Sequence, residues 1–267
     1  MGLSRSLEQI AIRAGGKNGR RLESVDVNVL EVRNMLKKRE DGAQYELRIP
    51  EFSVGAKDIV AVTGPSGCGK STTLDLLGMA LRPDEAECFI INARSGPLDI
   101  ASFWKGNDTG RLAMARRNNM GYVLQTGELF PFMTVRENTE LGALMAGKDR
   151  KTASRSAAEL MERLKIDHLA DVMPGRLSIG ERQRAAIARA LAPKPLLLLA
   201  DEPTAALDPL LARSVMKLFL DIIAEFGTSV IMVSHDLNMV HEFGFRECPV
   251  HVEKKNNNIV ATLGPGV

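Results

Sequence analysis

The chain has 267 residues, 45% of them hydrophobic and 25% charged, which is enough to bury the core of one large domain or of a domain with a subdomain. Its 35 basic and 33 acidic residues leave a formal net charge of +2, so the charge balance does not favour a nucleic-acid partner. No apolar run approaches the roughly 18 residues of a membrane span, and the longest aliphatic run, residues 196–200, has the length of a strand. We therefore expect a soluble chain whose contact with a membrane is at most peripheral.

The cysteines and the N-terminal residues suit a reducing compartment. Three cysteines are an odd number, and Cys68 lies in a glycine-rich loop where a disulfide would obstruct a ligand. Residues 1–24 lack a secretory pattern and place Leu3, Leu7 and Ile10 near helical spacing before a glycine-rich break. We expect them to form an N-terminal extension that is flexible or a short helix.

Alternating strands precede the glycine-rich loop. Apolar residues alternate with polar ones over residues 25–32 and again over residues 45–49, and Asp41-Gly42 between them is a turn signal. This pattern predicts an antiparallel β layer that flanks the next strand and whose surface could hold an adenine ring.

Residues 58–73 contain the most specific chemical pattern in the chain. An apolar strand, residues 59–62, is followed by a glycine-rich turn and by a helix that opens at Lys70, which matches the phosphate-binding pattern G-x-x-x-x-G-K-S in its required context. The glycines let backbone N–H groups surround an anion, the helix N-terminus adds partial positive charge, and Lys70 reaches the outer phosphates. Ser71 is expected to place its hydroxyl on Mg²⁺. The residues expected to bind the nucleotide are Gly64, Pro65, Ser66, Gly67, Cys68, Gly69, Lys70, Ser71 and Thr72.

Two strands and a basic helix are predicted next. Residues 88–92 have the pattern of a short strand, residues 95–97 that of a turn, and residues 111–117 that of a basic helix. Residues 121–125 predict a strand that ends in a single polar residue, Gln125.

An all-helical insert follows Gln125. One helix is predicted from residue 133 to 144, and residues 152–164 carry an apolar stripe at i, i+4, i+7, i+8 and i+11 with charged residues opposite. A third helix begins at Ser178, where Glu181 completes a capping box and the helix N-terminus is able to bind an anion. Because strands precede and follow the insert, we expect a helical subdomain over about residues 126–192.

Two apolar strands near the C-terminal end carry polar residues at their carboxyl ends. Residues 196–200 are followed by Asp201 and Glu202, where α/β sheets place their ligands. Asp201 is able to hold Mg²⁺ through water, and Glu202 to take a proton from an attacking water; an ordinary strand exit is the alternative. Residues 229–233 lead to His235, which by itself is more often a structural hydrogen-bonding residue.

In chain order, the phosphate loop, Gln125, residues 177–181, Asp201-Glu202, residues 206–208 and His235 resemble the motifs of the ATP-binding cassette (ABC) ATPases. The resemblance covers about residues 25–250. It implies an α/β fold, a P-loop NTPase of ABC type with a mixed central sheet, an antiparallel β subdomain and an inserted α-helical subdomain. Residues 251–267 are then expected to be a C-terminal tail.

The resemblance also implies ligands and roles. The ligands are ATP and Mg²⁺; Gln125 would sense Mg²⁺ and the γ-phosphate, Glu202 would be the catalytic base, and His235 would hydrogen-bond the γ-phosphate. Lys70 would act with them on the phosphates, and Ser71, Gln125 and Asp201 would form the metal site.

A second copy of the chain would complete each site. Residues 177–181 match the family's signature, whose Ser178, Gly180 and Glu181 would contact ATP held by the other copy in a head-to-tail dimer. Asp208 would cross the dimer interface.

Within the family, residues 180–191, 199–204 and 121–138 look like the branch that serves lipoprotein release, macrolide export and cell division. This implies a cytoplasmic ATPase on the inner face of the cell membrane that drives a separate integral membrane permease subunit, with export or extraction of a lipoprotein, lipid, peptide or drug-like substrate. Two alternatives remain. One is a module whose ATP-gated dimerisation regulates a membrane or cell-envelope partner without transport. The other is a soluble ABC ATPase of DNA repair or translation, whose usual coiled-coil insertion or second cassette this sequence lacks.

Three departures from the family pattern affect the expected site. Ile179 replaces the usual signature glycine and predicts slower hydrolysis, and Ala205 replaces a serine. The aromatic residue that usually stacks on adenine has no match, since residues 35–39 offer no ring and Tyr45 lies too close to Gly64 along the chain. A groove around residues 127–136 is the expected docking surface for the membrane subunit, with ordinary loop packing as the alternative.

Overall fold

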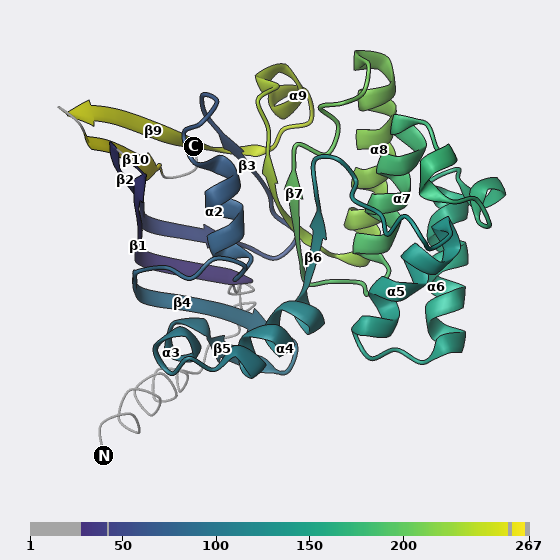
Figure 1. Cartoon of the computed structure of the whole chain (residues 1–267), viewed down its shortest axis with the longest axis horizontal. Helices are drawn as coiled ribbons and strands as arrows, with labels where there is room; N and C mark the ends of the chain where they lie inside the picture. Colours follow the sequence, from purple (N-terminus) through teal and green to yellow (C-terminus); the bar gives the residue numbers. More distant parts are fainter. Residues whose placement is uncertain (1–27, 42, 256–257, 265–267) are drawn as a thin grey trace, which may run out of the picture.

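The computed structural model describes residues 28–41, 43–255 and 258–264, and its strands form one sheet with helices on both faces (Figure 1). The strand order is β5-β4-β1-β2-β10-β9-β3-β8-β7-β6. The expected N-terminal extension, residues 1–24, lies outside the described residues. The mixed α/β sheet predicted from the sequence is confirmed.

An antiparallel layer forms one side of the molecule. It contains β1 (Leu30–Asp41), β2 (Ala43–Val54), β4 (Glu85–Ala93) and β5 (Gly96–Asp99). β1 and β2 meet at the predicted turn signal, but the described part of the first strand begins at Leu30, later than the alternation over residues 25–32 predicts. The turn predicted at residues 95–97 is also displaced, because Gly96 pairs with Ala93 and already belongs to β5.

Parallel strands form the centre of the sheet. They are β3 (Ile59–Thr63), β8 (Ser229–Val233), β7 (Leu197–Asp201) and β6 (Met120–Val123). Along β7, Leu198 and Ala200 face one apolar core, while Leu197 and Leu199 face the other. Burial on both faces explains why these strands are continuous apolar runs in the sequence.

The C-terminal residues belong to the sheet. β9 (Arg246–Lys255) is parallel to β3 and antiparallel to β10 (Asn258–Leu263), and β10 is parallel to β2. The expected boundary at residue 250 therefore falls inside a strand, which corrects the expectation of a tail over residues 251–263. The physical reason is that Val250, Ala261 and Leu263 are buried in the core beneath the antiparallel layer.

The helices divide between the two cores. α2 (Lys70–Leu77) packs between the antiparallel layer and the parallel strands, and α8 (Pro209–Phe226) covers the opposite face (Figure 1). The remaining helices outside the insert are α3 (Ile100–Lys105), α4 (Thr109–Asn119) and α9 (Leu237–Glu242). None of the helices in the described part of the chain is long and apolar enough to cross a bilayer.

The predicted helical insert is present as α5 (Val135–Met145), α6 (Arg150–Arg163) and α7 (Ile179–Leu191), with short 3-10 turns at Asp167–Leu169 and Pro174–Arg176. The apolar stripe of α6 is fully buried, as its spacing predicts. α5, α6 and α7 contact one another and stand beside β6 at one end of the parallel strands (Figure 1).

Candidate active site

The phosphate loop connects β3 to α2, and its backbone requires glycine at several positions. Gly64, Gly67 and Gly69 have φ angles of +142°, +75° and +102°. A Cβ atom at Gly64 would lie 2.9 Å from the Sγ of Cys68, and one at Gly69 would lie only 2.0 Å from the hydroxyl oxygen of Tyr45. The loop is therefore left-handed at all three glycines and closely packed at Gly64 and Gly69.

The loop also presents a set of unpaired amide donors. Within the described residues, no hydrogen bond involves the N–H groups of Gly69, Lys70, Ser71 or Thr72, and the N–H of Thr73 is the first to donate inside α2, to the carbonyl of Gly69 at 2.8 Å. Such free N–H groups at a helix N-terminus favour an anion. The Lys70 ammonium donates to the carbonyls of Gly64 and Pro65, both at 2.9 Å, so it lies over the same loop.

Two of the three ligands predicted for Mg²⁺, Ser71 and Asp201, meet at the end of β7. The hydroxyl of Ser71 donates a hydrogen bond to the carboxylate of Asp201. Burial raises the pKa of Asp201, the neighbouring Glu202 and Asp75 carboxylates raise it further, and the Ser71 hydroxyl and Lys70 oppose this shift. A hydroxyl and a carboxylate are ligands that Mg²⁺ prefers, so this pair fits the ion. The side-chain amide of the third predicted ligand, Gln125, donates to Glu202, the residue after Asp201.

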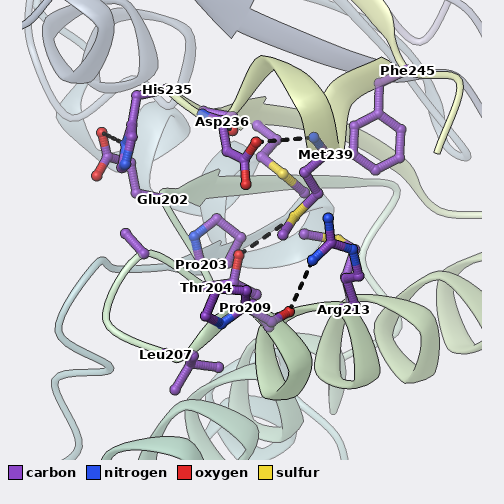
Figure 2. A pocket seen from close by; sticks show the side chains of 15 residues that line it. Glu202, Pro203, Thr204, Leu207, Pro209, Arg213, His235, Asp236, Met239 and Phe245 are labelled. Carbon is purple, nitrogen blue, oxygen red and sulfur yellow. Dashed lines mark hydrogen bonds and ion pairs between the residues drawn. The ribbon is translucent and has the colours of Figure 1, made fainter. Parts of the chain in front are cut away.

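Glu202 lies between Gln125 and His235, which come from two other elements. Its Oε2 accepts a hydrogen bond from Nε2 of Gln125 at 3.0 Å, and its Oε1 lies 3.1 Å from Nδ1 of His235. Figure 2 shows the Glu202 carboxylate and the His235 ring side by side. The backbone of Glu202 is left-handed, with φ of +47°, a conformation that costs a non-glycine residue about 1–3 kcal/mol. Three residues that the sequence suggests separately are thus brought together at one point.

Glu202 and His235 also line the cavity drawn in Figure 2, which is small. It has a volume of about 120 Å³ and contains Thr204, Met239 and Phe245, with a contact of 3.7 Å between Oγ1 of Thr204 and Sδ of Met239.

The signature residues form a capped helix start on the other side of the parallel strands. Oε2 of Glu181 accepts hydrogen bonds from the N–H of Ser178 at 2.8 Å and from its hydroxyl at 2.7 Å, which confirms the predicted capping box. These hydrogen bonds hold the pKa of Glu181 below its usual value. Ile179 is 60% exposed, whereas Gly180 is buried, and a Cβ atom there would lie 2.8 Å from Leu211. A Cβ atom at Gly180 would thus require the Leu211 side chain of the same chain to shift.

Asp208 caps the next helix. One of its oxygens accepts hydrogen bonds from the N–H groups of Leu210 and Leu211, at 3.2 and 3.1 Å, at the start of α8. The adjacent Leu210 side chain is 81% exposed. Within the described residues, no hydrogen bond joins Asp208 or the signature to the phosphate loop of the same chain.

Tyr45 is a site residue that sequence reasoning missed. Its hydroxyl donates to the carbonyl of Cys68 at 2.8 Å, inside the phosphate loop. The judgement that Tyr45 lies too close to Gly64 along the chain used sequence separation alone. Because β2 folds back over the loop, Tyr45 reaches it from the antiparallel layer; the alternation that points Tyr45, Leu47 and Ile49 to one face was the available signal.

Comparison with known proteins identifies the family. The model of the ABC transporter family matches residues 47–205, more than half of the chain. This chain belongs to the ABC transporter family. A lipoprotein-releasing system ATP-binding protein, LolD, of Idiomarina loihiensis is 37% identical over 216 residues, which cover 80% of this chain and 91% of that protein. An uncharacterised ABC transporter ATP-binding protein of Methanocaldococcus jannaschii, MJ0796, is 35% identical over 229 residues, which cover 82% of this chain and 91% of that protein.

Solved structures agree with this assignment. The dimeric, post-hydrolysis structure of the ATP-binding cassette MJ0796 bound to ADP and Pi matches with a TM-score of 0.66 at 30% identity, covering 86% of this chain and 96% of that one. The cbiO1 structure from Clostridium perfringens, part of the ABC transporter complex cbiONQ, matches with a TM-score of 0.69 at 25% identity and covers 87% of this chain and 86% of that one. This ABC protein therefore binds and hydrolyses ATP.

Proposed function

We propose that two copies of this ABC protein pair head to tail around two ATP molecules, and that hydrolysis drives a separate membrane subunit. The observation that carries the proposal is that one chain holds two half-sites that do not meet. α2, which follows the phosphate loop, and α7, which begins with the capped signature, pack in the two different cores on opposite faces of β7 (Figure 1). A second copy brings its α7 to the first copy's phosphate loop. The dimeric structure of MJ0796 supports this arrangement.

Each half-site has a distinct role. The free N–H groups and Lys70 bind the phosphates, and Ser71 with Asp201 would hold Mg²⁺, which supplies charge neutralisation at the phosphate oxygens when bound. Ser178 and Glu181 of the second copy aim the α7 N-terminus at the γ-phosphate, and Asp208 lies at the interface beside the exposed Leu210. The buried Gly180 contributes through packing and close backbone approach.

Glu202 acts as the general base that takes a proton from the attacking water. In the structure, Gln125 and His235 both contact its carboxylate. ATP offers phosphate oxygens to the same two polar groups, so its binding competes with Glu202 for them and leaves the carboxylate able to accept a proton. Gln125 and His235 thereby link occupancy of the phosphate loop to the state of the base.

The membrane subunit would dock in a groove between α4 and β6 on one side and α5 and α7 on the other. The groove has a volume of about 1070 Å³ and is largely apolar; Met114, Phe130 and Met145 line it and are 53%, 41% and 60% exposed. It also contains the following charged residues: Arg116, Arg117, Glu128 and Arg189. An amphipathic helix of a membrane subunit, with an acidic residue for the arginines, fits these features.

The segment expected to bind the partner is held on α7. Arg189 donates to the carbonyl of Glu128 at 2.7 Å and lies over the ring of Phe130 at 5.9 Å from the ring centroid. Because α7 begins with the signature residues, a helix in the groove would shift the signature and the residues after Gln125 together.

We also propose that the protein lies on the inner face of the cell membrane, attached through its partner. Lipoprotein or lipid extraction is the favoured transport reaction, since LolD proteins are among its relatives.

The test captures the partner directly. Glu202→Gln protein is purified from its native membranes with ATP and Mg²⁺, and the proteins that copurify are compared with those from the same capture carrying the additional change Lys70→Ala. We expect an integral membrane protein with an extracytoplasmic domain only in the first capture. Recovery of no membrane protein, or of the same proteins from both captures, would overturn the proposal.

A second variant tests the groove. Glu128→Lys places a fourth cation in a groove that already holds three arginines, so it should raise recovery of a membrane protein whose docking helix carries an acidic residue, while dimerisation with ATP persists. Unchanged recovery would remove Glu128 from the docking surface and leave ordinary loop packing as its role.

A further inference from the structure

Tyr45 contacts the phosphate loop from the antiparallel layer. It lies in β2, paired with Arg39 of β1 on one side and with Ile259 of β10 on the other, so both neighbouring strands hold its backbone in place. Its side chain is partly buried, and its hydroxyl donates to the carbonyl of Cys68 at 2.8 Å. The contact is close on both sides, since the hydroxyl also occupies the space where a Cβ atom at Gly69 would lie.

This hydrogen bond determines the orientation of a peptide plane. The peptide bond between Cys68 and Gly69 is trans, so its C=O and its N–H point in opposite directions. With the carbonyl of Cys68 directed at Tyr45, the N–H of Gly69 is directed away from the antiparallel layer. Within the described residues this N–H takes part in no hydrogen bond, and it lies next to the free N–H groups that open α2. The carbonyl is thus held on one side of the loop and an anion donor is presented on the other.

The tyrosine remains a donor at neutral pH. Burial raises the pKa of Tyr45 above its ordinary value, the electrostatic effect of Cys68 adds to this, and Arg39 opposes it. The left-handed backbone at Gly69, with φ of +102°, offers no side chain that could fix the same peptide from within the loop. The orientation of this N–H therefore depends on a residue outside the loop.

We propose that Tyr45 is a positioning residue that orients the Gly69 N–H toward the nucleotide phosphates by holding the Cys68 carbonyl. The inference rests on nucleotide binding at the phosphate loop, but it does not depend on the dimer or on a membrane partner. In this proposal Tyr45, the aromatic residue of β2 that contacts the loop, helps to bind the phosphates and does not stack on adenine. The C-terminal strand β10, which pairs with β2 beside Tyr45, contributes to the same support.

The experiment compares Tyr45→Phe with Tyr122→Phe. Each change removes one hydroxyl from one of the chain's two tyrosines; the Tyr122 hydroxyl lies 3.4 Å from Asp75 and does not contact the loop. Affinities for ADP and for pyrophosphate are measured by displacement of a fluorescent ADP analogue, and the melting temperature is measured without ligand. Pyrophosphate is the deciding probe because it has phosphates and no base.

We expect Tyr45→Phe to weaken ADP and pyrophosphate by the same factor of about three to ten, the range for one lost hydrogen bond. Tyr122→Phe should change both affinities less than twofold. Unchanged pyrophosphate affinity in Tyr45→Phe would overturn the proposal, as would an equal loss in Tyr122→Phe. Failure of the unaltered protein to bind ADP would instead refute nucleotide binding itself.

A Tyr45→Leu variant separates the hydroxyl from the ring. If the hydroxyl orients the loop, Tyr45→Leu weakens pyrophosphate as much as Tyr45→Phe does. If the ring instead stacks on the base, Tyr45→Leu weakens ADP alone while Tyr45→Phe keeps full affinity, and that outcome contradicts the proposal.

Discussion

Replacement of Glu202 by glutamine separates catalysis from nucleotide binding. Glutamine keeps the size of the side chain and one acceptor oxygen, so contact with either Gln125 or His235 is retained. Its amide cannot take a proton from water. The change also removes a negative charge next to the bound phosphates, so ATP affinity should stay the same or rise.

The expected loss can be estimated from the surroundings of Glu202. A positioned general base contributes about 10²–10⁴ in rate, or about 3–5 kcal/mol of activation free energy. The Glu202 side chain is 18% exposed, and the nearest alternative carboxylate, Asp201, accepts a hydrogen bond from Ser71. Because no other described residue is positioned to replace the base, we expect a loss of about 10³-fold or more, within that range.

The assay measures steady-state phosphate release together with binding of a fluorescent ATP analogue. Glu247→Gln is the matched control, since the Glu247 carboxylate also accepts a side-chain hydrogen bond, from the Thr63 hydroxyl at 2.7 Å, and lies 3.5 Å from a histidine, His241. The control should retain turnover within about threefold of the unaltered protein, since it leaves the base in place. More than a tenth of normal turnover in Glu202→Gln would refute the assignment of Glu202 as the base.

Three further predictions concern the signature and the phosphate loop. Hydrogen bonds from Ser178 lower the folded-state pKa of Glu181, so the ionised carboxylate stabilises the fold above the ordinary glutamate pKa, and this stabilisation is lost as pH falls through the lowered value. Glu181→Gln should lose this acid-side pH dependence in thermal melts from pH 7 to about pH 3. An unchanged dependence of the melting temperature on pH would contradict the capping argument. Ile179→Gly should raise dimeric turnover by permitting closer approach to the second copy's ATP, and should lower the free energy of unfolding by about 0.5–1 kcal/mol, as measured with urea; slower turnover would show that the exposed isoleucine aids the interface. Lys70→Ala should abolish ATP binding in an equilibrium titration, because it removes the cation of the phosphate loop; near-normal affinity would place the anion site elsewhere.

Local patterns of the sequence were enough to predict the parts of the site that lie on one element. The strand, loop and helix around Lys70, the capping box of Ser178 and Glu181, and the buried stripe of α6 are all present as predicted. Each depends on residues within a few positions of one another, where backbone conformation and helical spacing leave few alternatives.

The tertiary structure decided which distant residues meet. Glu202 contacts Gln125 across 77 positions and Tyr45 contacts Cys68 across 23, because the order of the strands and the fold of β2 over the loop place them together. The C-terminal hairpin entered the sheet for the same reason: β10 pairs with β2, far away along the chain, and buries Ala261 and Leu263 there. Sequence spacing determines which residues share one face of a strand, whereas strand order, set by packing of the whole sheet, determines what that face contacts.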